Sequence, residues 1–120
     1  GMRRALVVDD SLVVRNYHVS LLKTLSFEVE TAENGAEAYE KCLQTPYSLI
    51  LCDVNMPVMD GYRFTKRVRE LDNYEKVPII LVTTLNSEQD RKKALLAGAT
   101  LFIVKPMNFE ILKKMLEAVL

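Results

Sequence analysis

The sequence predicts an α/β fold in which a doubly wound parallel sheet lies between two layers of helices. Short runs that are apolar at every position recur along the chain, and such runs are typical of strands buried on both faces. Segments with apolar residues at helical spacing lie between these runs, so that strand and helix alternate five times. Five βα units with short connections imply right-handed crossovers and a three-layer (βα)5 arrangement.

The first half of the chain is expected to hold three strands and two helices. Residues 5–8 (ALVV) and 49–52 (LILC) are continuous apolar runs, whereas residues 27–31 (FEVET) alternate and suit an edge strand. The first helix is predicted from the apolar stripe Val14, Tyr17, Leu21 and Leu25. The second is predicted from Ala36, Tyr39 and Leu43, and its start resembles a capping box formed by Asn34 and Glu37.

The second half continues the alternation. Strands are expected at 79–82 (IILV) and 101–104 (LFIV), and apolar stripes predict helices before the first of these and after the second, at Phe64, Val68, Leu71 and at Phe109, Leu112, Leu116, Val119. The helix between the two strands is capped by Ser87 and ended by Gly98, but its apolar stripe is thin. We therefore expect that helix to be weakly held and able to shift at small cost.

Composition narrows the class of protein. The 120 residues correspond to about one domain, and 49% hydrophobic with 27% charged residues is typical of a globular chain. Sixteen acidic and sixteen basic residues cancel, which argues against non-specific binding to nucleic acid or to membranes. No membrane span or signal peptide is recognisable, so a cytoplasmic location is expected. We interpret residue 1 as a tag remnant and residues 2–120 as the domain.

Polar residues follow four of the five predicted strands. In open parallel sheets, ligands bind beyond the carboxyl ends of the strands. Those ends carry, in order, Asp9 and Asp10, then Asp53 and Asn55, then Thr83, and finally Lys105 with Pro106. The second strand is expected to offer nothing strongly ionic at its immediate end. The remaining candidates, Cys42, Cys52 and His18, are interpreted as packed structural residues because no metal-ligand spacing connects them.

Three carboxylates gathered at one edge would repel one another, so they favour a bound cation. Oxygen ligands without a nearby Cys or His favour Mg²⁺ over zinc, and Lys105 suits an adjacent phosphate oxygen. Asp53 would be held rigidly by a buried strand yet face solvent, which suits a nucleophile. Pro57 and the turn at Asp60 and Gly61 are expected to hold back the following loop and to start the next helix.

At these positions the chain resembles the response-regulator receiver domain of bacterial two-component signalling, similar to the single-domain chemotaxis type. The resemblance covers residues 4–120 and rests on VVDDS at 7–11, LCDVNMPVMDG at 51–61, ILVTT at 80–84 and FIVKP at 102–106. It implies a flavodoxin-like sheet of strand order 2-1-3-4-5. It also implies a cytoplasmic phosphoprotein that takes part in a phosphorelay.

The resemblance implies a role for each of these residues. Asp53 would be the phosphoacceptor, assisted by Thr83 and Lys105. Mg²⁺, for which Mn²⁺ could substitute, would be held by Asp9, Asp10, Asp53 and the backbone carbonyl of Asn55. Thr83 and Phe102 would be switch residues, and the bond before Pro106 would be cis, which costs little at an X-Pro position. Phe102 departs from the frequent tyrosine, and Leu85 is apolar where many relatives carry a polar group.

The implied partners are a sensor histidine kinase or phosphotransfer protein and a downstream protein or fused output domain. Phosphorylation would switch the face formed by the fourth helix, fifth strand and fifth helix, and could drive dimerisation. The domain would assist its own phosphorylation and dephosphorylation but turn over no substrate, and would not bind nucleic acid directly or enter a membrane.

Three alternatives are considered. An aspartyl phosphohydrolase is disfavoured because DDSLV lacks the usual D-x-D spacing and 120 residues leave no room for a cap. A flavin module is disfavoured because Asp9 and Asp10 would repel the flavin phosphate. A degenerate receiver that acts as a phosphorylation-independent docking module remains the main alternative.

Overall fold

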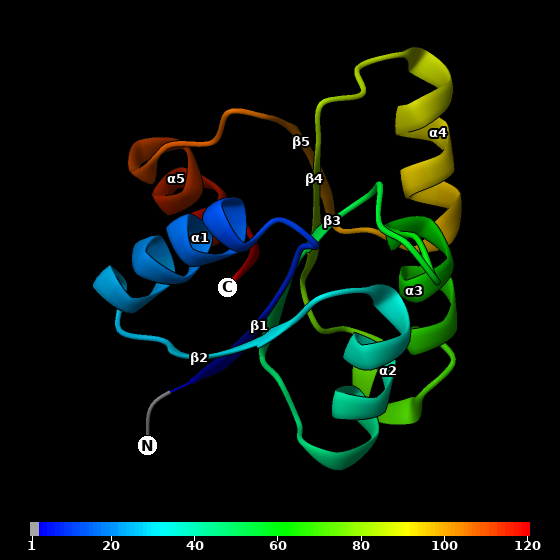
Figure 1. Cartoon of the computed structure of the whole chain (residues 1–120), viewed down its shortest axis with the longest axis horizontal. Coiled ribbons are helices and arrows are strands. Elements are labelled where there is room, and N and C mark those ends of the chain that lie inside the picture. The colour runs from blue at the N-terminus through cyan, green and yellow to red at the C-terminus, as the bar shows by residue number, and fades with distance from the viewer. Residues whose placement is uncertain (1–2) are drawn as a thin grey trace.

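The computed structural model describes residues 3–120, so the interpretations of Gly1 as a tag remnant and Met2 as the start lie outside it. Strands and helices alternate along the whole described chain (Figure 1). The strands are β1 (Arg4–Val8), β2 (Glu28–Ala32), β3 (Leu49–Asp53), β4 (Ile79–Thr83) and β5 (Leu101–Val104). The helices are α1 (Leu12–Thr24), α2 (Gly35–Gln44), α3 (Gly61–Val68), the 3₁₀ turn η1 (Asp72–Tyr74), α4 (Glu88–Ala97) and α5 (Phe109–Val119).

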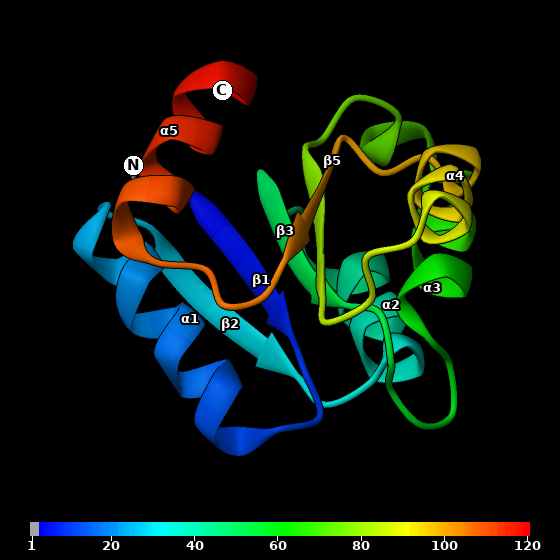
Figure 2. The ribbon, with the colours of Figure 1, turned by 90° about the horizontal axis from the view of Figure 1, so that it is seen from above.

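The five strands form one parallel sheet in the order β2-β1-β3-β4-β5, which confirms the predicted fold class and strand order. Helices α1 and α5 cover one face, and α2, α3 and α4 cover the other (Figure 2). Because side chains alternate along a strand, each face has its own core. Val7 and Leu51 pack in the cluster under α1 and α5, whereas Leu6 and Ile50 pack in the opposite one.

Helices α3 and α5 bury most of the predicted stripes, whereas α1 and α2 bury theirs only in part. In the α1 stripe, Leu21 is buried and Leu25 packs against the core as predicted, but Tyr17 is 46% exposed. In α2, Tyr39 packs against the core, but Leu43 is 52% exposed. The other buried residues are Arg15, His18 and Leu22 in α1, and Gly35, Ala38 and Cys42 in α2. Some buried positions of these two helices are therefore occupied by small residues or by hydrogen-bonded polar residues. A prediction based only on large apolar residues does not find them.

Two boundaries also differ from the prediction. Strand β2 ends at Ala32 rather than at residue 31, so the charged Glu33 follows it directly and the expectation of an uncharged end was wrong. Helix α3 ends at Val68, and Leu71 lies beyond it, just before η1. The first difference brings a carboxylate to the same edge of the sheet as Asp9.

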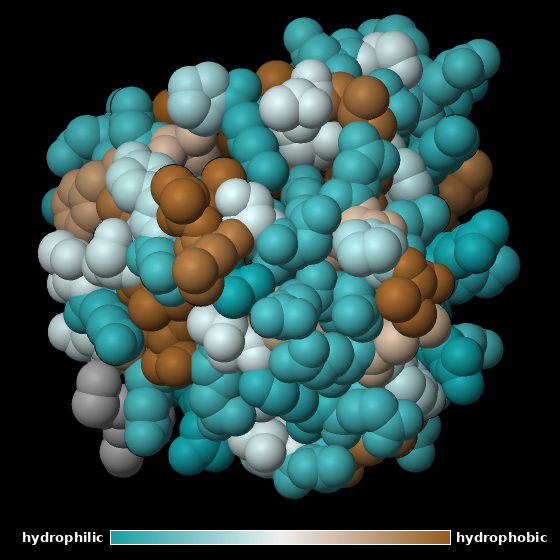
Figure 3. Space-filling model, in the orientation of Figure 1, coloured by the Kyte–Doolittle hydropathy of each residue, from teal (hydrophilic) through white to brown (hydrophobic). Residues whose placement is uncertain are grey.

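Helix α4 is thinly attached, as predicted. Ala94 is its one buried residue, whereas Leu95 and Leu96 are 70% and 85% exposed. Figure 3 shows a largely hydrophilic surface on the side seen in Figure 1, with apolar side chains in separate small groups. None of the helices described between residues 3 and 120 is long and apolar enough to span a bilayer.

Candidate phosphoacceptor and metal site

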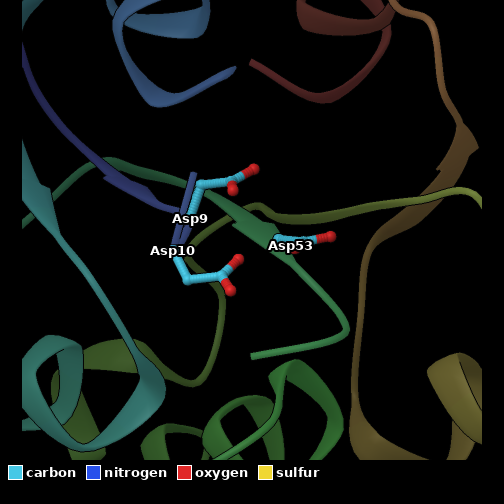
Figure 4. Close-up of side chains that lie close together, drawn as sticks. All are labelled: Asp9, Asp10 and Asp53. Atoms are coloured by element: carbon cyan, nitrogen blue, oxygen red, sulfur yellow. The ribbon is translucent and has the colours of Figure 1, made fainter. Parts of the chain in front are cut away.

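Three carboxylates meet where β1 and β3 end. Val8 pairs with Cys52 across these adjacent strands, so Asp9 and Asp53 leave the sheet at the same level. One oxygen from each of Asp9, Asp10 and Asp53 lies within 4.8 Å of the others (Figure 4). Asp9 and Asp53 are 1% and 8% exposed, whereas Asp10 is exposed to solvent. The residues predicted to gather here from the sequence therefore do so.

Lys105 reaches this cluster from the end of β5. Its Nζ lies 3.4 Å from Oδ2 of Asp9 and 3.3 Å from Oδ1 of Asp53. The carboxylates are also held by backbone donors, because Ser11 N–H donates to Asp9 and Val54 N–H donates to Asp53, each at 2.9 Å. One ammonium thus balances only part of three nearby negative charges.

The electrostatics favour an added cation. Burial raises the pKa of the Asp53 carboxyl, and the neighbouring Asp9 carboxylate raises it further, while Lys105 and the Val54 N–H act in the opposite direction. The donor set is entirely carboxylate oxygen, which suits a hard divalent ion. The residues present therefore fit a divalent metal.

Because its pKa is raised in the folded protein, Asp53 favours folding at low pH, and this contribution is lost as pH rises through the folded pKa. In EDTA at pH 7, Asp53→Asn is therefore expected to raise the free energy of unfolding, on the order of 1 kcal/mol. The gain should shrink as pH falls through the raised pKa of Asp53, because both side chains are then neutral. Urea unfolding at several pH values measures it, and a gain that does not depend on pH would contradict this origin.

The remaining predicted residues lie around the same edge. Thr83, at the end of β4, is 1% exposed, and its hydroxyl accepts a hydrogen bond from Leu85 N–H at 3.1 Å. Lys105 N–H donates to the Thr83 carbonyl at 2.7 Å, which joins the ends of β4 and β5. The Lys105–Pro106 bond is cis, as expected, and Asn55 is exposed in the loop after β3.

Phe102 lies in β5, half-buried and three residues before Lys105. The Arg91 guanidinium from α4 stands over its ring, 5.4 Å from the centroid, and also donates to Asn86 Oδ1 at 3.1 Å. Arg91 therefore connects the loop after β4 to this aromatic side chain. The sequence prediction did not include Arg91.

Close backbone packing fixes the loop after Asp53. Gly61 N–H donates to the Val54 carbonyl at 2.8 Å, and Asp60 caps α3 by accepting from Arg63 N–H at 2.9 Å. A Cβ on Gly61 would lie only 2.3 Å from the Asp53 carbonyl oxygen. Helix α3 thus begins directly against the backbone of Asp53, and this contact requires glycine.

The same loop contains a strained residue. Val58 has φ of 69° although its side chain is β-branched and 80% exposed. Val58→Asn is expected to raise the free energy of unfolding by about 1 kcal/mol, because asparagine tolerates this conformation better. Urea unfolding would measure the gain. Val13→Asn, at a 79% exposed helical position, is the control, and an equal gain there would contradict strain at Val58.

Two polar residues lie next to the site although the sequence did not predict them there. Arg15 is buried beneath the loop that carries Asp9, and His18 lines a cavity of about 140 Å³ with Lys105 and Pro106. Burial lowers the pKa of His18. His18 is packed as predicted, and it lies beside Lys105 and Pro106 at the end of β5. The available signal was the helical spacing of Ser11, Arg15 and His18, which places three polar residues on one face of the first helix.

Comparisons with known proteins agree with one another. A family model described as "Response regulator receiver domain" matches residues 5–117. Chemotaxis protein CheY1 of Helicobacter pylori is 39% identical over 119 residues, which covers 98% of this chain and 96% of the relative. The gliding motility regulatory protein of Myxococcus xanthus is 36% identical over 95% of this chain, but the chain spans only 15% of that relative.

Solved structures give the same result. Chemotaxis protein CheY4 of Vibrio cholerae has a TM-score of 0.94 and 41% identity over 100% of both chains. The receiver domain of sensor histidine kinase PA1611 from Pseudomonas aeruginosa, which was solved with a magnesium ion coordinated in its active site cleft, has a TM-score of 0.91 and 29% identity. That match covers 99% of this chain and 98% of the other.

Proposed function

Since this chain belongs to the response regulator receiver domain family, we propose that it is a phosphorylation switch whose phosphoacceptor is Asp53. The observation that carries the proposal is the cluster of Asp9, Asp10 and Asp53 with Lys105 in contact. Its phosphodonor would be a sensor histidine kinase or a phosphotransfer protein. We place this exchange in the bacterial cytoplasm, by analogy with the chemotaxis relatives.

The metal in this proposal is Mg²⁺, for which Mn²⁺ would substitute. Asp10, Asp53 and the backbone carbonyl of Asn55 would hold it, with Asp9 acting partly through water. When bound, the ion supplies positive charge that offsets the negative charge of the phosphoryl oxygens. The carboxylate cluster and the magnesium ion in the related PA1611 domain support this assignment.

Phosphoryl transfer at this site would need alignment and charge neutralisation more than further chemistry. A carboxylate oxygen of Asp53 forms a bond to phosphorus while the bond from phosphorus to the donor's histidine nitrogen breaks, and the leaving imidazole keeps that electron pair. Lys105, already 3.3 Å from Asp53, would contact the transferred oxygens. The chain would thus promote its own modification without turning over a substrate.

Phosphorylation would then change the surface formed by α4, β5 and α5. The phosphoryl group adds about −1.5 to −2 charges and strong acceptors, which gives the Thr83 hydroxyl a reason to leave Leu85 N–H. That movement would open space toward which Phe102 could turn, away from Arg91. A full exchange from 1:99 to 99:1 needs about 5.5 kcal/mol of differential stabilisation.

The altered face would control a downstream protein or an output domain fused to this one, and phosphorylation could drive dimerisation. The thin attachment of α4, which buries only Ala94, favours movement of this face. The proposal includes no nucleic-acid or membrane contact by this domain, in keeping with its formal charge of zero.

The test is incubation with acetyl phosphate and Mg²⁺, followed by intact-mass measurement. We expect one added phosphoryl group on the wild-type protein, and none when Asp53→Asn replaces the acceptor or EDTA removes the metal. Asp60→Asn, outside the cluster, is the matched control and should still be modified. No adduct on the wild-type protein would contradict the proposal and favour the phosphorylation-independent docking module.

A further inference from the structure

We propose that Arg15 is a positioning residue for the metal pocket, which it shapes through the backbone of Asp9 rather than through its charge. This inference rests on the proposed function, because it concerns how the carboxylates are placed for Mg²⁺. Arg15 belongs to α1 and makes no hydrogen bond or ion pair to any of the three carboxylates; its partner near the pocket is the Asp9 carbonyl.

The contact that carries the inference is buried. Nη1 of Arg15 donates to the Asp9 carbonyl oxygen at 2.8 Å, and the arginine side chain is only 10% exposed. Arginine is seldom buried unless it is paired, and the buried partner of this guanidinium is the main-chain oxygen of Asp9. The helix supplies Arg15 rigidly, since Ser11 caps α1 just after the acidic pair.

Holding this carbonyl fixes the orientation of Asp10. The Asp9 carbonyl and the Asp10 amide belong to one planar peptide unit, so the plane cannot turn without moving both residues. The Asp9 N–H is tied to the Ala32 carbonyl at 3.1 Å, and Asp9 Oδ1 accepts from Ser11 N–H at 2.9 Å. The direction in which Asp10 leaves the strand is therefore fixed by the hydrogen bonds of Asp9 on one side and by the Arg15 bond to the Asp9 carbonyl on the other.

The distal contact of Arg15 is much weaker. Nη2 lies 3.9 Å from Oε1 of Glu33, whose side chain is 69% exposed, and exposed pairs of this kind contribute little. Glu33 therefore provides a matched control that removes one partner of Arg15 without touching the Asp9 carbonyl.

Replacing Arg15 should change the affinity for Mg²⁺ in opposite directions, depending on whether Arg15 acts through its charge or by holding the Asp9 carbonyl. A positive charge beside the pocket opposes a second cation, so loss of charge alone would tighten Mg²⁺ binding. Loss of the hydrogen bond instead frees the peptide plane and should weaken binding about tenfold, the lower end of the effect of residues that orient metal ligands. The sign of the change thus separates the two roles.

The experiment is a titration of ¹⁵N-labelled, EDTA-treated protein with MgCl₂, followed by amide chemical shifts at a temperature where each variant is folded. We expect Arg15→Met to raise the Kd for Mg²⁺ about tenfold, Arg15→Lys to stay within about threefold of the wild type, and Glu33→Gln to leave Kd unchanged. Lysine can still donate to the carbonyl, so its rescue distinguishes placement from a general loss of structure.

If Arg15→Met does not fold, Arg15→Gln replaces it, because its amide nitrogen lies two bonds nearer the backbone and cannot reach as far. The same tenfold loss is then expected. A Kd equal to or tighter than that of the wild type in these variants would overturn the role of Arg15 and leave the proposed function standing. Failure of the wild-type protein itself to bind Mg²⁺ would overturn both.

Discussion

Lys105→Met is expected to slow the phosphorylation of Asp53 by acetyl phosphate about 100- to 1,000-fold while tightening the binding of Mg²⁺. The rate should fall because a preorganised positive group that would contact the transferred oxygens is removed, and one such donor is typically worth this much. The affinity for Mg²⁺ should rise because Nζ lies 3.4 Å from Asp9 and 3.3 Å from Asp53, where it competes with the cation.

Rates from intact-mass time courses and Kd values from MgCl₂ titration measure the two effects separately. Lys76→Met is the matched control, because Lys76 is exposed in the loop before β4, at the opposite end of the sheet. It should change neither quantity. A Lys105→Met protein that is phosphorylated at the wild-type rate would show that the ammonium has no part in the transfer.

Gly61→Ala is expected to destabilise the protein by about 2–3 kcal/mol and to abolish most phosphorylation. The new Cβ would meet the Asp53 carbonyl oxygen at 2.3 Å and the Val54 Cα at 2.9 Å, both of which are backbone atoms that cannot move independently. Either α3 or the end of β3 must shift, and a shift of β3 carries the Asp53 carboxylate with it.

The control is Gly35→Ala, at the corresponding first position of α2. Its Cβ would meet the Met59 carbonyl oxygen at 2.6 Å, so stability should also fall, but Asp53 is not in contact. Urea unfolding and the acetyl phosphate rate per folded molecule should therefore separate the two variants. Equal rates per folded molecule in both would contradict the view that Gly61 places Asp53.

The sheet and the gathering of the acidic residues could be predicted from sequence because both follow from the strands. A run such as 49–52 is apolar at every position, which indicates a strand covered on both faces. Parallel strands then bring their carboxyl ends to one edge, which places Asp9 and Asp53 side by side on adjacent strands and brings Lys105 within reach of them.

The full set of residues that α1 and α2 bury could not be predicted from the spacing of apolar residues. Arg15 and His18 are polar, and the sequence does not show that Arg15 has a buried carbonyl to bind, so the exposed Tyr17 was counted in its place. The left-handed backbone at Val58 was equally hidden, because no propensity places a β-branched residue there. These features depend on tertiary contacts, and they surround the candidate site.

The edge of the sheet beyond β1 and β3 is proposed to bind a divalent ion next to Asp53. Crystals soaked in Mn²⁺, with data collected to locate the metal by anomalous scattering, would reveal the ion there. We predict one strong peak within about 2.5 Å of carboxylate oxygens from Asp10 and Asp53 and of the Asn55 carbonyl oxygen. A strong peak elsewhere, with the space between Asp10 and Asp53 left without one, would contradict the claim.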